Sequence, residues 1–167
     1  MTMTRMVVRR GRSTRQAGMV VALAAIFALG IAYFAEFLLH MVPCPLCYIE
    51  RWPYRIVVVL GLSAVVVPQR FGRVLLGLAV LVMLGDVAIA FVHVGTEQHW
   101  WKSPLPECNA PPPGFGAMPL RPSASCDSPV YLIPGLPISF ATMDLLYALT
   151  VALAIGTYLR VSQWRDR

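Results

Sequence analysis

Charge is scarce in this chain of 167 residues. Asp, Glu, Lys and Arg together make up 13% of the sequence, whereas an average globular domain has about 25%. Only eight residues are acidic, while 57% are hydrophobic and the mean hydropathy is +0.66. This composition argues against an ordinary water-soluble domain and is typical of a membrane protein.

The motifs of several large enzyme classes are also absent. The sequence contains no Gly-rich phosphate-binding loop, no arrangement typical of a Ser/His/Asp hydrolase and no clear internal repeat. The formal net charge is +6, but the basic residues flank apolar stretches and form no single basic patch. We therefore expect no nucleic-acid partner.

Long apolar runs dominate the chain instead. Four of them approach the roughly 20 residues that a helix needs to cross about 30 Å of hydrocarbon. They cover residues 17–39, 48–67, 72–94 and 139–160. We therefore expect residues 1–167 to form a single domain, an all-α membrane protein built as a four-helix transmembrane bundle.

The first apolar run could also belong to a signal peptide. It follows the basic stretch RMVVRRGRSTR, whose Arg pair resembles a twin-arginine export signal. However, the run continues well past the roughly 7 to 15 residues of a signal-peptide core, and no A-x-A cleavage pattern closes it. We therefore expect it to remain as the first membrane span.

The basic residues predict the orientation, because loops that stay in the cytoplasm are enriched in Lys and Arg. The N-terminal tail, the connection after the second run and the C-terminal tail hold most of them. These are Arg5, Arg9, Arg10, Arg12, Arg15, Arg70, Arg73, Arg160, Arg165 and Arg167. The long loop, about residues 95–138, holds only Lys102 and Arg121. We expect both termini in the cytoplasm, and the loops at about 40–47 and 95–138 on the opposite side.

This orientation places all four cysteines outside the cytoplasm. Cys44 and Cys47 adjoin the second run, and Cys108 and Cys126 lie in the long loop. Reducing systems do not act there as they do in the cytosol, so an even number of cysteines points to disulfide bonds.

Three kinds of site can use these cysteines. A Cys-x-x-Cys pair can form half of a tetrahedral zinc site. Its other ligands could come from His93, His99, Cys108 and Cys126, although the second pair lacks the tight spacing of a zinc knuckle. Two inert disulfides that brace the loops are the second alternative. A pair that opens and closes in catalysis is the third, and the surroundings of Cys47 favour it.

Cys47 is expected at the start of a helix. A helix that began at Pro53 would have only 15 residues before Pro68, about 22 Å, which is too short for a span. We expect the helix to begin near Cys47, with Pro53 kinking its first turns. The helix N-terminus would favour the Cys47 thiolate, and Arg51 would lie one turn deeper on the same face. Arg51 could lower the thiol pKa and bind a carbonyl oxygen, or serve only as an interfacial anchor.

Three stretches together resemble the disulfide bond formation protein B (DsbB) family. CPLCYIER, residues 44–51, is similar to its Cys-x-x-Cys-x-x-x-Arg signature. AFVHVGTEQHWWKSPLPEC, residues 90–108, resembles the end of its third span and the loop cysteine that follows. CDSPVYLIPGLPISFATMDLL, residues 126–146, resembles a loop cysteine that runs into the fourth span. The short interval between the loop cysteines leaves the related DsbI-like subfamily open.

The resemblance implies a protein-disulfide:quinone oxidoreductase of the bacterial inner membrane, with its redox loops in the periplasm. Such a protein passes electrons from a thioredoxin-like, DsbA-type partner to ubiquinone or menaquinone in the membrane and needs no metal. Arg51 and Cys47 match residues beside the quinone, and His93 stands where a histidine often lies near it.

The resemblance also assigns the four cysteines. Cys44 and Cys47 match the quinone-proximal pair, and Cys108 and Cys126 match the pair that meets the partner. We expect the partner to attack Cys108 and free Cys126, which then attacks Cys44 and leaves Cys47 as a thiolate facing the quinone. The alternative is a structural membrane protein with two inert loop disulfides.

Four other residues attract attention. Asp86 lies inside the third run and Glu36 near the outer end of the first. An acid at membrane depth is either a functional residue or a hydrogen-bonded packing group. Trp100 and Trp101 are typical of the aromatic belt at a membrane interface.

Overall fold

The computed structural model describes residues 2–109, 125–132, 135 and 137–164, and for residues 2–13, 107 and 109 it describes the backbone only. The long helices are α1 (Thr2–Phe37), α2 (Pro45–Val66), α3 (Gln69–Glu97) and α4 (Phe140–Trp164). A short 3-10 helix, η1 (Pro106–Asn109), lies in the long loop. The described residues contain no strand, so the expected all-α fold is confirmed for this part of the chain.

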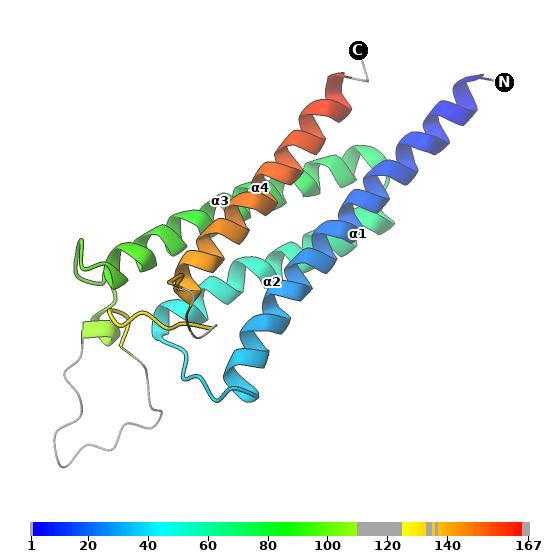
Figure 1. Ribbon diagram of the computed structural model, residues 1–167. Coiled ribbons are helices and arrows are strands. Elements are labelled where there is room, and N and C mark those ends of the chain that lie inside the picture. Colours follow the sequence, from blue (N-terminus) through cyan, green and yellow to red (C-terminus); the bar gives the residue numbers. More distant parts are fainter. Residues whose placement is uncertain (1, 110–124, 133–134, 136, 165–167) are drawn as a thin grey trace, which may run out of the picture.

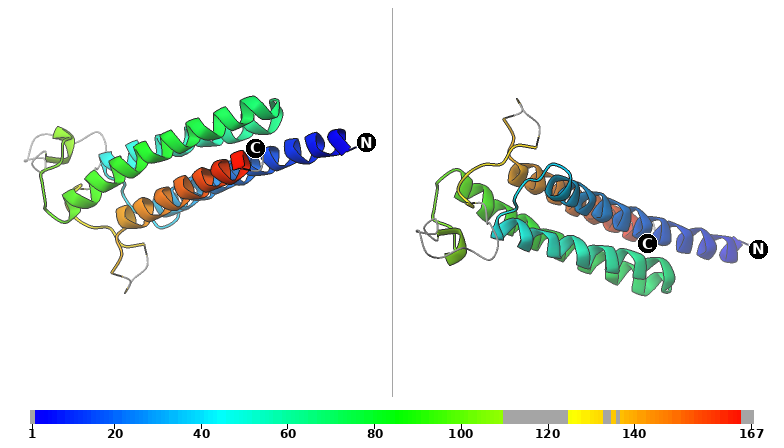
Figure 2. Two further views of the ribbon diagram at one scale, coloured as in Figure 1. Left: turned by 90° about the horizontal axis from the view of Figure 1, so that it is seen from above. Right: turned by 90° about the horizontal axis from the view of Figure 1, so that it is seen from below.

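The four long helices pack side by side as a bundle (Figure 1). α2 packs against α1 and α3, and α4 packs mainly against α3. The two chain ends lie at the same end of the bundle, and the α1–α2 connection, η1 and the segment before α4 lie at the other (Figures 1 and 2). The segments that carry the cysteines therefore gather at one end, away from both termini.

Three of the helices are long and apolar enough to cross a membrane. They are the Thr14–Phe37 part of α1, all of α3 and all of α4. α2 is more polar, because Glu50, Arg51 and Arg55 lie in its first half. Large apolar side chains such as Val20 and Leu81 are more than 60% exposed, as expected for a surface that faces lipid. The protein is therefore a membrane protein, while a fourth crossing by α2 and the orientation remain predictions.

Small residues let α1 and α2 approach closely. A Cβ atom on Gly61 would lie 2.8 Å from the carbonyl oxygen of Gly18 and 2.9 Å from the backbone nitrogen of Ala22. Such close backbone contacts, made possible by small residues, are common between membrane helices. Deeper in the bundle the side chains of Leu76 and Met83 are fully buried and fill the core.

α2 begins two residues before Cys47, close to the predicted start. Pro45 lies in the first turn, where its missing N–H group costs no hydrogen bond, and Cys44 is the N-cap residue. The Cys44 sulfur accepts a hydrogen bond from the backbone N–H of Cys47 at 3.2 Å. Pro53 lies inside the helix, as the sequence predicts.

Candidate functional site

Cys44 and Cys47 face each other across the first turn of α2. Their sulfur atoms lie 2.6 Å apart, and neither takes part in a disulfide. Cys44 is 4% exposed and Cys47 is partly buried. A disulfide requires a sulfur separation of about 2.05 Å, so the pair can close with little movement of the backbone.

The pKa of the Cys44 thiol lies below its usual value. The main cause is the hydrogen bond from the Cys47 side chain, and backbone N–H groups of Cys47 and Leu46 add to it, whereas burial acts in the opposite direction. The sequence predicted that the helix N-terminus would favour the thiolate of Cys47. In the structure Cys44 receives this stabilisation, because Cys44 is the residue that caps the helix.

His93 of α3 connects Cys44 to a buried carboxylate. Its Nε2 lies 3.4 Å from the Cys44 sulfur, and its Nδ1 lies 2.7 Å from Oε1 of Glu50. Both His93 and Glu50 are almost fully buried. When Nδ1–H donates to Glu50, Nε2 is positioned to accept the proton of the Cys44 thiol. The family resemblance places His93 near the site, but the link to Glu50 appears only in the folded chain.

Arg51 lies one turn further along α2 and is held by α1. One of its Nη atoms donates to the carboxylate of Glu36, and its guanidinium lies 5.1 Å from the ring centroid of Tyr33 and 5.0 Å from that of Tyr48. Its buried Nε has no hydrogen-bond partner among the described residues. A buried donor without a partner is unusual in folded proteins, and here it points to a ligand acceptor.

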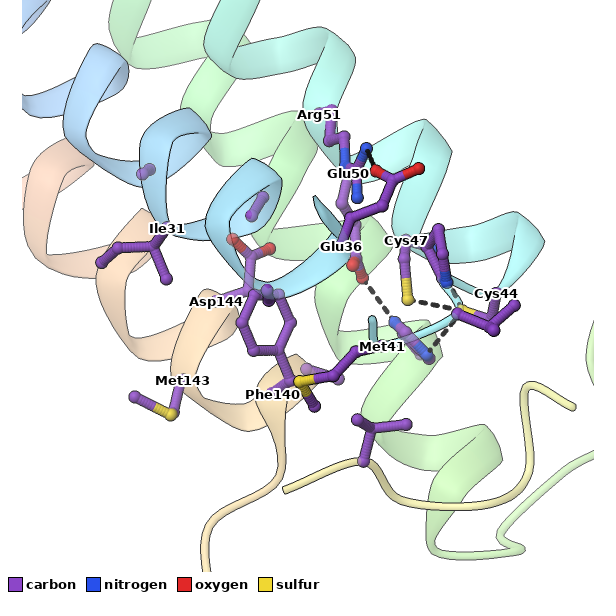
Figure 3. Close-up of a pocket in the computed structure, with 18 of the residues that line it drawn as sticks. Ile31, Glu36, Met41, Cys44, Cys47, Glu50, Arg51, Phe140, Met143 and Asp144 are labelled. Carbon is purple, nitrogen blue, oxygen red and sulfur yellow. Dashed lines mark hydrogen bonds and ion pairs between the residues drawn. The ribbon is translucent and has the colours of Figure 1, made fainter. Parts of the chain in front are cut away.

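A cavity of about 150 Å³ adjoins these side chains (Figure 3). Apolar residues of α1 and α4, including Ile31, Phe140 and Met143, form much of its wall. The polar side chains that line it come from all four helices, from the residue that caps α2 and from the segment before α4. They are Glu36, Cys44, Cys47, Glu50, Arg51, Tyr54, His93, Glu97, Ser125, Ser128, Asp144 and Tyr147.

The second cysteine pair forms a disulfide between Cys108 and Cys126, whose Cα atoms lie 5.3 Å apart. This is the pairing that the family resemblance implies. Cys126 is 1% exposed and belongs to one buried cluster with Cys44 and Leu46, against which Cys47 and Cys108 also pack. The structure thus brings all four cysteines together.

The metal alternative depends on Cys44, Cys47 and His93. Their ligand atoms lie within 4.8 Å of one another, but a structural zinc site has four ligands. Within the described residues, the loop cysteines are bonded to each other and Nδ1 of His99 lies 3.1 Å from a backbone carbonyl. The four-ligand arrangement considered from the sequence is therefore not assembled in this state, and the absence of a metal stays a prediction.

Of the two membrane-depth acids and two tryptophans noted in the sequence, only Glu36 belongs to the site. Glu36 is part of the site as the partner of Arg51, whereas Asp86 is fully buried in α3. Trp100 and Trp101 are exposed and pack on each other and on Phe91, consistent with an interfacial position.

Helices of membrane-spanning length enclose a close cysteine pair, and a loop disulfide packs on that pair. This arrangement defines a membrane protein built for thiol and disulfide chemistry. A family model described as "Disulfide bond formation protein DsbB" matches residues 14–157, and the chain belongs to this family.

Individual relatives agree with this assignment. "Disulfide bond formation protein B" of Cupriavidus necator is 26% identical over 158 residues, which cover 88% of this chain and 94% of the relative. The protein of the same name from Cupriavidus pinatubonensis is 25% identical over the same length and coverage. "Uncharacterized protein RP370" of Rickettsia prowazekii is 28% identical over 150 residues, covering 84% of this chain and 85% of that protein. No solved structure matches the chain at a significant level.

Family membership places the protein in the machinery of disulfide bond formation, as a membrane-bound oxidoreductase.

Proposed function

We propose that the protein is a thiol:quinone oxidoreductase. It reoxidises a periplasmic thioredoxin-like, DsbA-type dithiol protein and passes the electrons to ubiquinone or menaquinone in the inner membrane. The observation that carries the proposal is the packing of all four cysteines in one cluster, with Cys44 and Cys126 buried and the inner pair lining a largely apolar cavity. Electrons can thus move from a loop to the membrane interior by thiol–disulfide exchange.

Electrons enter through the loop disulfide. Cys108 is more exposed than Cys126, and Cys126 packs against Cys44. A thiolate of the partner attacks Cys108 and releases Cys126, which attacks Cys44 of the oxidised inner pair and releases Cys47 as a thiolate. Each exchange breaks one S–S bond and forms another. The partner's second thiol then closes the partner's disulfide and releases Cys108, which attacks Cys126 and releases Cys44 as a thiolate. The partner and the loop pair are then oxidised, and Cys44 and Cys47 are reduced.

His93 and Glu50 handle the proton of Cys44. The thiolate, not the thiol, is the nucleophile, so the proton must leave before the reduced Cys44 can close its disulfide with Cys47. Nε2 of His93 faces the sulfur, and the contact of Nδ1 with Glu50 stabilises the positive charge that His93 gains. The dyad therefore keeps Cys44 reactive inside an otherwise apolar cluster.

The residues around the cavity fit a quinone. When bound, a quinone accepts two electrons and two protons and so allows the inner pair to close into a disulfide. Apolar side chains of α1 and α4 suit its ring, and the unpartnered Nε of Arg51 suits a carbonyl oxygen. Cys47 and Arg51 line the same cavity, so the electron-donating sulfur and the carbonyl-binding group share one site.

Absorbance and thiol titration of the purified full chain test the proposal. After reduction of the inner pair and removal of reductant, added ubiquinone or menaquinone should be reduced as two thiols disappear. Cys47→Ser should abolish this reaction, because no disulfide can then form between residues 44 and 47. Two negative results together would contradict the proposal: the thiols persist with both quinones, and the loop disulfide does not react with a dithiol protein. The chain would then be a structural protein with inert disulfides.

The order of exchange has its own test. In Cys126→Ser no loop disulfide can form, so the Cys108 thiolate should open the disulfide of the oxidised partner and hold the partner as a mixed disulfide, because no Cys126 thiol remains to displace it. A partner trapped on Cys44 would contradict entry through the loop.

A further inference from the structure

We propose that Asp144, supplied through Tyr54 by Asp86, is the proton donor to the far side of the quinone cavity. The inference rests on the proposed function and adds to it a proton pathway through the bundle core. It concerns Asp144, Tyr54 and Asp86, which come from three different helices and take no part in the thiol exchange.

Asp144 and Tyr54 both line the cavity. The Tyr54 hydroxyl of α2 donates a hydrogen bond of 2.7 Å to Oδ1 of Asp144 on α4. Oδ2 of Asp144 is buried and has no partner among the described residues. In Figure 3, Asp144 approaches the cavity from α4, whereas Cys47 and Arg51 approach it from α2. One carboxyl oxygen is thus committed to Tyr54, and the other remains for a ligand.

Asp86 continues this chain into the core. Its side chain is fully buried in α3, and neither of its carboxyl oxygens has a hydrogen-bond partner among the described residues. Asp86 acts electrostatically on the Tyr54 hydroxyl, and Asp144 acts on Asp86, so the three groups form one interacting set. The other titratable groups that act on the two acids are Glu50 and His93.

The missing hydrogen bonds of these carboxyl oxygens indicate that the two acids carry a proton and are not simply packing groups. Three of the four carboxyl oxygens lack a partner in the described structure, whereas a packing group would normally have its hydrogen bonds satisfied. An ionised carboxylate in apolar surroundings without a cation is very costly. Asp86 and Asp144 therefore each hold one transferable proton.

The chemistry balances without an additional reactant. Closure of the Cys44–Cys47 bond releases two electrons and two thiol protons, and quinone reduction consumes two of each. With a quinone bound, Oδ2 of Asp144 would supply one of these two protons, and the thiol proton that His93 takes up would supply the other. Tyr54 passes its hydroxyl proton to Oδ1 of Asp144 and takes another from Asp86. The remaining thiol proton leaves to solvent. Asp86 takes up one proton in return, so the total number of protons is unchanged.

The first test needs neither quinone nor turnover. Infrared spectra of the purified full chain at neutral pH should contain the carbonyl stretch of a protonated carboxylic acid. Asp86→Asn or Asp144→Asn should remove or shift that band, whereas Asp127→Asn, which changes an exposed loop carboxylate, should leave it unchanged. A band unaffected by both core substitutions would overturn the proposal.

The second test measures quinone reduction by the reduced inner pair. Asp144→Asn preserves size and polarity but holds no acidic proton, so the rate should fall about 100-fold with little change in the apparent KM. Asp144→Glu should restore most of the rate, and Tyr54→Phe should also slow the reaction. Exchange of the loop disulfide with a dithiol protein should stay at the wild-type rate in all three variants and shows that they are folded.

The two proposals fail in different ways. If the wild-type chain reduces no quinone, the proposed function is wrong. If it reduces quinone and Asp144→Asn does so equally fast, the proton pathway is wrong and the proposed function stands.

Discussion

Cys44 serves both as the N-cap of α2 and as a member of the inner cysteine pair. The same sulfur accepts the backbone N–H of Cys47 and faces His93. The helix start therefore stabilises negative charge on the sulfur that, in the proposed reaction, exchanges with the loop.

This dual role predicts a change in the pH dependence of Cys44. Its lowered pKa means that the thiolate persists as the pH falls, so Cys44 should be alkylated at lower pH than an ordinary cysteine. Cys47→Ala removes the side-chain donor, the main cause of the shift, but keeps the backbone N–H. The midpoint of alkylation should therefore move to higher pH. Mass spectrometry of the peptide that contains Cys44 measures this, and an unchanged midpoint would contradict the role of Cys47.

Arg51 should affect the quinone more than the thiols. Arg51→Lys keeps a positive charge beside Glu36 but loses the Nε donor, so the apparent quinone affinity should fall about tenfold, the effect of one hydrogen bond to a charged group. Arg51→Ala should weaken it further. The measurement is turnover against quinone concentration, with loop-disulfide exchange as the control because it occurs at a separate pair. An unchanged quinone dependence in Arg51→Ala would leave Arg51 as an interfacial anchor.

The sequence predicts the site only as far as local spacing reaches. Cys44, Cys47 and Arg51 lie within eight residues, so about two turns of one helix are enough to place them together. The contacts of Arg51 with Glu36, of His93 with Glu50, and of Tyr54 with Asp144 join different helices. Such pairs depend on helix rotation and packing, which the apolar runs do not determine.

At the level of elements, the close approach of α1 and α2 predicts different effects at two glycines. A Cβ at Gly61 would meet backbone atoms of Gly18 and Ala22 at less than 3 Å, so Gly61→Ala must push the helices apart. We expect a loss of about 1–3 kcal/mol in stability. Gly77 has nothing within 4 Å of its added Cβ, and Gly77→Ala should be neutral or stabilising by up to about 1 kcal/mol. Thermal unfolding in one detergent compares the two, and equal stability would contradict the packing argument.

The helices themselves were largely predictable. Long apolar runs define their number and approximate extent, and the prolines define the start of α2. The capping role of Cys44 was not predicted, because a sulfur acceptor is not a usual capping group in sequence patterns. Whether α2 crosses the membrane depends on how Glu50, Arg51 and Arg55 are accommodated, which composition alone does not predict.

At the level of the whole molecule, the orientation is open to a direct test. The basic residues predict cytoplasmic termini, and the structure puts the cysteine-bearing segments at the opposite end of the bundle. After reduction, Cys108 should react with a membrane-impermeant maleimide added to spheroplasts. In a background without native cysteines, Ser13→Cys should react only after lysis. Labelling of residue 13 in intact spheroplasts would reverse the orientation.

The Cys108–Cys126 bond also makes the intervening chain a closed covalent ring. A single proteolytic cut anywhere inside that ring leaves one molecule, and the two pieces separate on a denaturing gel only where Cys126 is bonded neither to Cys108 nor to Cys44. If acid quenching and alkylation stop a nicked sample at successive times, the ratio of intact to split bands reports the fraction of molecules whose Cys126 is a free thiol at each moment. Electron entry can thus be followed as a change in apparent molecular weight on a gel, without any spectroscopic probe.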